Sequence, residues 1–126
     1  MYETFEEFLP AIKKLHPSDS LTKKDLLVDQ FMIEKEEHLS MFYAPHNEYI
    51  NNKAKIVIVG ITPGWSQMKT AYEQLVRTID SHHNIEQILK DVKKAASFSG
   101  SMRSNLIQML DECGVHVALK LDSSSS

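Results

Sequence analysis

The feature that most constrains the fold of this chain is a run of four β-branched residues, Ile56-Val57-Ile58-Val59. Such side chains favour extended backbone, and an unbroken apolar run is typical of a strand that is covered on both faces. A glycine-containing loop, residues 60–64, follows the run, and apolar residues then recur at helical spacing through residues 68–76. Strand, loop and amphipathic helix in this order predict the opening of an α/β unit.

The rest of the chain carries mostly helical patterns. Between residues 31 and 43, apolar and polar residues alternate around a charged run, which predicts two strands joined by a turn. A helix is the competing interpretation there, because the turn contains neither Gly nor Asn. Apolar residues at helical spacing predict further helices over residues 5–15, 85–92 and 102–113. We therefore predict an α/β domain with three layers, α/β/α, in which a short, mostly parallel sheet lies between helices.

Several helix ends can be assigned from capping residues. Thr4 with Glu7, Thr22 with Asp25, and Asn84 with Gln87 have the three-residue spacing of a helix N-terminus. Gly114 stands where a residue in the left-handed conformation commonly ends a helix.

A chain of 126 residues, 42% hydrophobic and 25% charged, has the composition of one globular domain. We predict a single α/β domain over residues 1–122, made of a helical lead-in (1–30) and a core (31–122). A serine-rich tail, residues 123–126, follows it.

Charge and cysteine content narrow the partners and the compartment. A net charge of −3 gives no overall attraction to nucleic acid or to an anionic membrane, so any anion-binding surface must be local. The single cysteine, Cys113, excludes an internal disulfide framework and a four-cysteine zinc site. The N-terminus lacks a signal-peptide pattern, and no apolar run approaches the roughly 20 residues that span a bilayer. We expect a cytoplasmic protein without a membrane partner.

The loop after Val59 is the first candidate for a ligand site. In open α/β sheets, ligands bind outside the carboxyl ends of the strands. Gly60 and Gly64 allow a sharp turn and close approach of a ligand, and Pro63 stiffens the loop. The glycine spacing matches neither the nucleoside triphosphate motif nor the dinucleotide motif. A purely structural strand-to-helix turn is the competing interpretation.

Two segments resemble motifs of the uracil-DNA glycosylase superfamily. The run AKIVIVGITPGWSQ is similar to its first motif, in which a buried strand delivers a G-x-x-P-G loop to the base pocket. The run SFSGSMRSNLIQMLDECGV resembles a second segment, a Phe-x-Gly turn followed by spaced leucines and a glycine. Together they lie within residues 54–119, roughly half the chain, and resemble the N-terminal half of such a domain. The superfamily's Asn-bearing strand and H-P motif are expected beyond the end of this chain.

The resemblance implies a base pocket around the loop. Thr62 would hold the attacking water, at the place where many members have Asn, and Phe98 would stack on the flipped base. Ile61 stands where another branch has an acidic residue. Thr62 cannot accept a proton near neutral pH, so the loop supplies no general base. The implied substrate-binding set is Gly60, Ile61, Pro63, Gly64, Trp65 and Phe98.

Charged and aromatic residues near these motifs allow two interpretations each. Lys94 and Arg103 would contact DNA phosphates, or they belong to ordinary charged helix faces. Trp65 would stack beside the pocket, or it anchors the core behind it.

Three further residues have simpler explanations. His82 and His83 could bind a metal, but adjacent histidines lack helical ligand spacing and favour a solvated loop. Cys113 lies on the predicted apolar face of its helix and is expected to be an inert core thiol. No metal or cofactor is expected.

The leading hypothesis is a uracil-DNA-glycosylase-like protein that binds a nucleobase or damaged or single-stranded DNA, with N-glycosidic bond hydrolysis as its chemistry. The alternative is a non-catalytic module of the same fold that binds a protein or a small nucleotide. An exposed sheet face is expected to support a homodimer or a protein partner.

Overall fold

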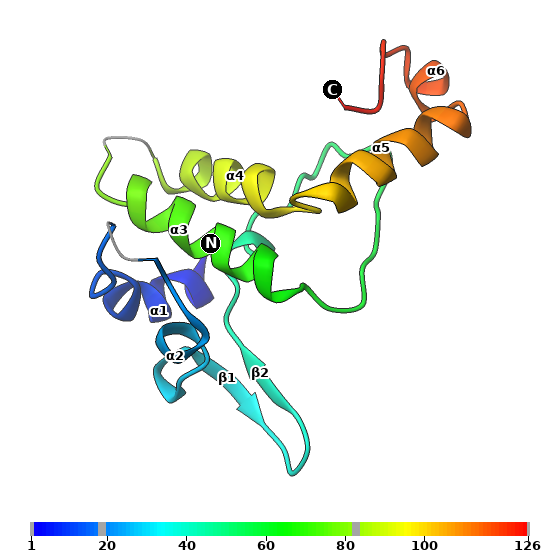
Figure 1. Ribbon diagram of the computed structural model, residues 1–126. Coiled ribbons are helices and arrows are strands. Elements are labelled where there is room, and N and C mark those ends of the chain that lie inside the picture. The colour runs from blue at the N-terminus through cyan, green and yellow to red at the C-terminus, as the bar shows by residue number, and fades with distance from the viewer. Residues whose placement is uncertain (1, 18–19, 82–83, 126) are drawn as a thin grey trace. The chain divides into compact units, whose positions relative to one another are not determined.

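Helices make up most of the structure, a computed structural model that describes residues 2–17, 20–81 and 84–125. Internal contacts divide the chain into two units, Met1–Ala96 and Ser97–Ser126. The first unit contains α1 (Glu3–Ile12), α2 (Lys23–Leu26), the 3-10 helix η1 (Asp29–Phe31), β1 (Met32–Lys35), β2 (Ser40–Phe42), the 3-10 helix η2 (Pro45–Asn47), α3 (Trp65–Thr78) and α4 (Ile85–Ala96). The second unit contains α5 (Ser101–Glu112) and α6 (Val115–Leu119) (Figure 1).

The core of the first unit forms between α1, η1, α3 and α4. Aromatic rings join these elements: Phe8 stacks on Tyr43 with ring centroids 4.5 Å apart, and Phe31 meets the edge of Tyr72 at 5.2 Å. The Tyr72 hydroxyl donates a hydrogen bond to the Tyr43 carbonyl, 3.0 Å away. The most deeply buried side chains include Phe5, Ile12, Phe31, Tyr72, Leu75, Leu89 and Val92.

The predicted pair of strands is confirmed. β1 and β2 form an antiparallel hairpin in which Met32 pairs with Phe42 and Lys35 with Ser40. Alternating apolar residues decide this element, although its turn lacks the glycine or asparagine of most tight hairpins.

Most of the predicted helix ends are confirmed. The Asp25 carboxylate accepts hydrogen bonds from the Thr22 N–H and hydroxyl at the start of α2, at 2.7 and 2.6 Å. The Asn84 side-chain oxygen accepts a hydrogen bond from the Gln87 N–H, 2.8 Å away, at the start of α4. Gly114, just after α5, has a φ of +72°, the left-handed conformation that commonly ends a helix. The prediction for Thr4 is wrong, because α1 begins at Glu3 and Thr4 lies inside it.

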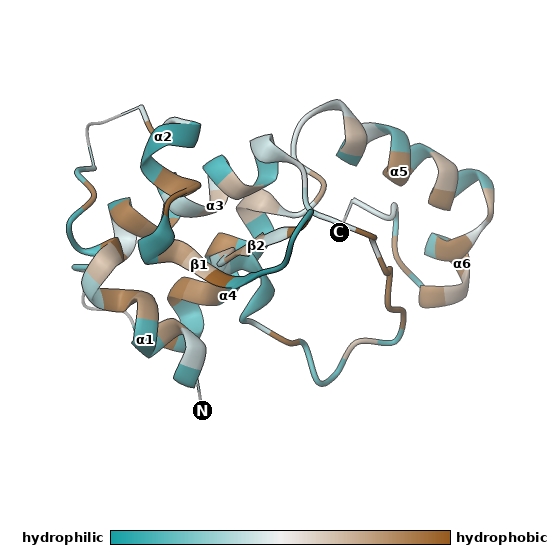
Figure 2. Cartoon of the chain, turned by 90° about the horizontal axis from the view of Figure 1, so that it is seen from below, coloured by the Kyte–Doolittle hydropathy of each residue, from teal (hydrophilic) through white to brown (hydrophobic). Residues whose placement is uncertain are grey.

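The predicted central strand and the three-layer α/β/α fold are wrong. Residues 56–59 belong to no strand, and their side chains are between 46% and 87% exposed. In the part of the chain that the structure describes, the sheet is the antiparallel β1–β2 pair. Strand propensity is expressed only where a neighbouring strand satisfies the backbone N–H and C=O groups, and residues 56–59 have none. Figure 2 shows this hydrophobic stretch as a brown tube without an arrow.

The second unit is a helix pair whose end is tied to α5. The Asp111 carboxylate accepts hydrogen bonds from the Ser123 hydroxyl at 2.8 Å and from the Ser124 N–H at 2.7 Å. Hydrogen bonds from Ser124 lower the pKa of Asp111 the most, and the bond from Ser123 lowers it further. The prediction of a core thiol is wrong, because Cys113 is exposed and no residue of α5 is buried.

Candidate functional site

A pocket of about 330 Å³ opens in the first unit beside the start of α3. Four of the loop residues singled out in the sequence, Thr62 to Trp65, line it. We call it the Trp65 pocket. Its full lining is Lys23, Leu27, Ser40, Met41, Phe42, Ala44, Thr62, Pro63, Gly64, Trp65 and Met68.

One face of α3 positions the aromatic wall of this pocket. Trp65, Met68 and Tyr72 are spaced by three and four residues, so they share that face. Tyr72 is buried and holds the carbonyl of Tyr43, just beyond β2. The Tyr43 N–H in turn donates to the carbonyl of Phe31 at 2.8 Å. These hydrogen bonds fix the end of the hairpin against α3, and residues of both β2 and α3 line the pocket.

The loop enters α3 in a defined conformation. Gly64 caps the helix with extended backbone, φ −74° and ψ 163°. Its N–H donates to the Gln67 side-chain oxygen at 2.8 Å, and its carbonyl accepts the Met68 N–H at 3.1 Å. Because both backbone groups of Gly64 are used, the pocket floor is held from the helix side.

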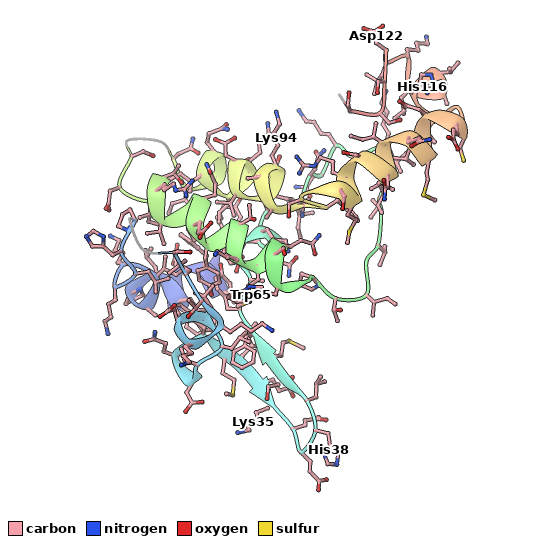
Figure 3. The ribbon with its side chains drawn as sticks, viewed as in Figure 1. Lys35, His38, Trp65, Lys94, His116 and Asp122 are labelled. Atoms are coloured by element: carbon pink, nitrogen blue, oxygen red, sulfur yellow. The ribbon has the colours of Figure 1, made fainter. Side chains whose placement is uncertain are left out.

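A cation lies against the tryptophan ring. The Lys23 ammonium is 6.0 Å from the centroid of the Trp65 ring, within cation–π range. Figure 3 labels Trp65 where α3 begins, next to the base of the hairpin. The pocket therefore combines a partly exposed indole, a positive charge and mostly apolar walls, a set that suits a flat ring carrying a nearby negative charge.

The other predicted site residues lie elsewhere. Gly60 and Ile61 are exposed and do not line the pocket, and Ile61 is 101% exposed. Lys94 is exposed on α4, well apart from Trp65 (Figure 3). Phe98 and Arg103 belong to the second unit.

Within the second unit, Phe98 and Arg103 shape the turn ahead of α5. Phe98 has a φ of +52°, a conformation that costs a residue with a side chain about 1–2 kcal/mol. The Arg103 guanidinium donates a hydrogen bond to the Ser97 carbonyl across this turn. Arg103 therefore has a structural task in this turn.

Sequence reasoning missed the wall of the pocket opposite the loop. Lys23 and Leu27 come from α2 and its end, and residues 40–42 come from β2. No local pattern connects these segments with residue 65, since the contact depends on how the hairpin packs on α3. The Thr22–Asp25 cap was the one available signal, because it fixes where α2 begins.

A buried histidine on η2 and a partly buried lysine on α4 belong to the contact between these two elements. His46 is 6% exposed, and its Nδ1 atom finds no hydrogen-bond partner among the described residues. Burial, followed by the nearby Lys93 ammonium, lowers the pKa of His46. Burial also lowers the pKa of Lys93, which donates to the Tyr49 carbonyl at 2.6 Å. This group links η2 to α4.

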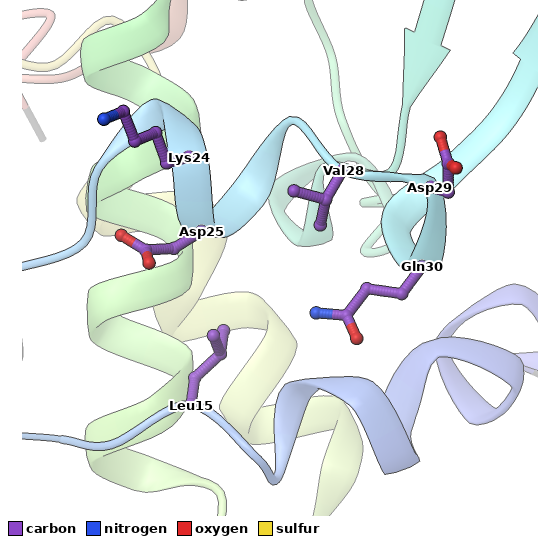
Figure 4. Close-up of a pocket in the computed structure, with 6 residues that line it drawn as sticks. All are labelled: Leu15, Lys24, Asp25, Val28, Asp29 and Gln30. Atoms are coloured by element: carbon purple, nitrogen blue, oxygen red, sulfur yellow. The ribbon is translucent and has the colours of Figure 1, made fainter.

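A second cavity, of about 470 Å³, is shallow and lies beside α2 (Figure 4). The Asp25 carboxylate that lines it already accepts two hydrogen bonds from Thr22. The cavity contains none of the site residues predicted from the sequence. Its lining is Leu15, Lys24, Asp25, Val28, Asp29 and Gln30.

Comparison with known proteins finds a relative in Bacillus subtilis. The chain is 52% identical over 115 residues to the uncharacterized protein YoxB of Bacillus subtilis (strain 168). The match covers 90% of this chain and 44% of YoxB, so the chain spans less than half the length of that relative. No family model matches the chain, and no solved structure matches it.

Two class-level observations concern the described residues alone. Over residues 2–17, 20–81 and 84–125, no helix combines the length and the apolarity needed to cross a membrane. The same residues contain no cluster of three or more His, Cys, Asp or Glu side chains arranged to hold a metal ion. His82 and His83 lie outside the described residues.

Proposed function

We propose that this protein binds a nucleobase in damaged or single-stranded DNA, and that the base lies in the Trp65 pocket. One observation carries the proposal. The Lys23 ammonium lies 6.0 Å from the centroid of the Trp65 ring, in a pocket that residues of a G-x-x-P-G loop also line. An aromatic ring that stacks on a base contributes roughly 1–3 kcal/mol. The lysine would contact the adjoining phosphate. The resemblance of the G-x-x-P-G loop, residues 60–64, to the first motif of the uracil-DNA glycosylase superfamily supports the same proposal.

The size and lining of the pocket suit one base. A volume of about 330 Å³ lies at the lower end of ligand pockets, which run from roughly 300 to 1,000 Å³. Leu27, Met41 and Phe42 supply apolar walls. Ser40 and Thr62 supply hydroxyl groups that both donate and accept hydrogen bonds, as a base edge requires.

Binding is proposed as the main activity, with N-glycosidic hydrolysis as a slow second one. Thr62 can orient a water molecule, but its hydroxyl does not take up a proton near neutral pH. General base catalysis contributes roughly 10²- to 10⁴-fold, so hydrolysis that relies on Thr62 would be slow. A non-catalytic module that binds a small nucleotide or a protein remains the alternative proposal.

A binding assay with labelled oligonucleotides tests this proposal. We expect a single strand with one uracil to bind more tightly than the same strand with an abasic site. Trp65→Leu should weaken binding to the uracil strand by about 5- to 150-fold, and Trp65→Phe should restore part of it. Melting temperatures of both variants control for the contact of Trp65 with the core. Equal affinity for the two strands would reject the base pocket, and binding of free nucleotides alone would favour the alternative.

Hydrolysis is tested on the same uracil strand. Slow formation of abasic sites, reduced further in Thr62→Val, is the expected result. If wild-type protein forms none above background, the proposal reduces to binding alone.

A further inference from the structure

The segment from Lys55 to Ile61 presents an apolar surface of unusual continuity. Scattered exposed apolar residues are normal, but contiguous ones mark interaction sites. We call these residues the 55–61 segment. The exposed fractions are 46% for Ile56, 76% for Val57, 46% for Ile58, 87% for Val59 and 101% for Ile61.

The backbone of this segment is also without partners. The Ala54 N–H donates to the Asn51 carbonyl, and Gly64 is the next residue with a backbone–backbone hydrogen bond. Between them, no described residue shares a backbone hydrogen bond with another described residue. Unpaired N–H and C=O groups on a β-prone segment are a template for strand pairing. At Gly60 no other atom lies within 4 Å of where a Cβ would stand, so a second backbone can approach there.

The exposure pattern indicates what kind of partner fits. Side chains on successive residues of a strand point to opposite faces, and here both faces are apolar. A strand that is apolar on both faces needs cover on both. Pairing with a second copy of the same segment would leave both faces of the ribbon in water. The partner must therefore bring a strand together with elements that cover it.

We propose that the 55–61 segment is a strand-pairing surface, and that its partner is a β-strand of a folded polypeptide equivalent to the part of YoxB outside the match. The match covers 90% of this chain, so the segment, near the middle of the chain, lies within it. More than half of YoxB lies outside the match, which is ample length for a folded partner. Main-chain hydrogen bonds would pair the two strands, and contacts between apolar side chains would supply the remaining binding energy. This inference does not depend on the proposed function.

Hydrogen exchange in whole YoxB tests the proposal without separating the partner from its chain. Amides of the YoxB stretch that aligns with the 55–61 segment should exchange at least about a hundredfold more slowly than those of this protein. Equally fast exchange in the two proteins would overturn the proposal. Slow exchange in this protein alone, together with a dimer in sedimentation, would assign the surface to a second copy and would also overturn it.

Co-expression with the unmatched part of YoxB supplies the mutational test. We expect a one-to-one complex that is weakened at least tenfold by Val59→Pro, which removes an N–H donor, and by Ile58→Asp, which charges one face. Ile50→Asp is the matched control, because Ile50 is 71% exposed and lies outside the segment. Melting temperatures of the variants alone should stay close to that of the wild type, since the residues of the segment are exposed and do not belong to the buried core cluster. A complex that tolerates both variants as well as it tolerates the control would overturn the proposal.

Discussion

Lys23 carries the charge that a nucleic acid would meet at the Trp65 pocket. Lys24, its neighbour on α2, faces the second cavity instead. Lys23→Ala should weaken oligonucleotide binding and reduce the salt dependence of log K by about 0.7, the loss of one contact to a single strand. Lys24→Ala should change neither quantity. Anisotropy titrations at several salt concentrations measure both, and equal effects of the two variants would contradict the assignment.

His46 makes stability depend on pH in a predictable direction. Its pKa is lowered in the folded state, chiefly by burial, so near neutral pH the residue is mostly uncharged in both states. Below its ordinary pKa of about 6.5, the unfolded chain takes up a proton that the folded chain resists, and stability falls. Between about pH 7 and pH 5, His46→Gln should lose less stability in urea unfolding than wild type. The control variant His38→Gln, at an exposed position, should lose as much stability as wild type over this pH range. If the unfolding free energy of His46→Gln falls with pH in parallel with that of wild type, the assignment to His46 is wrong.

At the scale of elements, the cap of α4 is the clearest local determinant. Asn84→Ala removes the acceptor of the Gln87 N–H and should cost about 0.5–2 kcal/mol of unfolding free energy. Asn84→Asp retains an acceptor and should cost much less. Thermal or urea unfolding compares the three proteins, and equal losses in Ala and Asp would show that the cap contributes nothing.

Elements whose determinants lie close together in sequence were predicted well. The hairpin follows from alternation around residues 34–37, and α3 from apolar spacing through residues 68–76. The caps at Thr22 and Asn84 need only neighbours three residues away. The 56–59 strand failed for the opposite reason, since a strand requires a second strand that the residues themselves do not encode.

The same distinction divides the candidate site. The loop side of the Trp65 pocket was identified because Thr62 to Trp65 are consecutive. The α2 and hairpin side could not be, because it depends on the packing of distant segments. The Tyr72–Tyr43 hydrogen bond holds the end of the hairpin against α3, and the Lys23 ammonium lies 6.0 Å from the Trp65 ring. Those are contacts between distant residues, which periodicity does not reveal.

At the scale of the whole molecule, every described residue of the hydrophobic core cluster belongs to the first unit, Met1–Ala96. A fragment ending at Ala96 should therefore unfold cooperatively, with a melting temperature within a few degrees of the full chain. Far-ultraviolet circular dichroism and calorimetry on the fragment and the full chain measure this. A fragment without a cooperative transition would show that residues 97–126 are needed for the core to form.

The most direct test of the Trp65 pocket uses the residue itself. Trp65 is the single tryptophan of the chain, so tryptophan fluorescence reports this site alone. On titration with a uracil-containing single strand, we predict saturable quenching with the same dissociation constant as anisotropy, and weaker binding for Lys23→Ala by both methods. If anisotropy shows binding while the fluorescence of Trp65 stays unchanged, the nucleic acid binds elsewhere and the central claim is wrong.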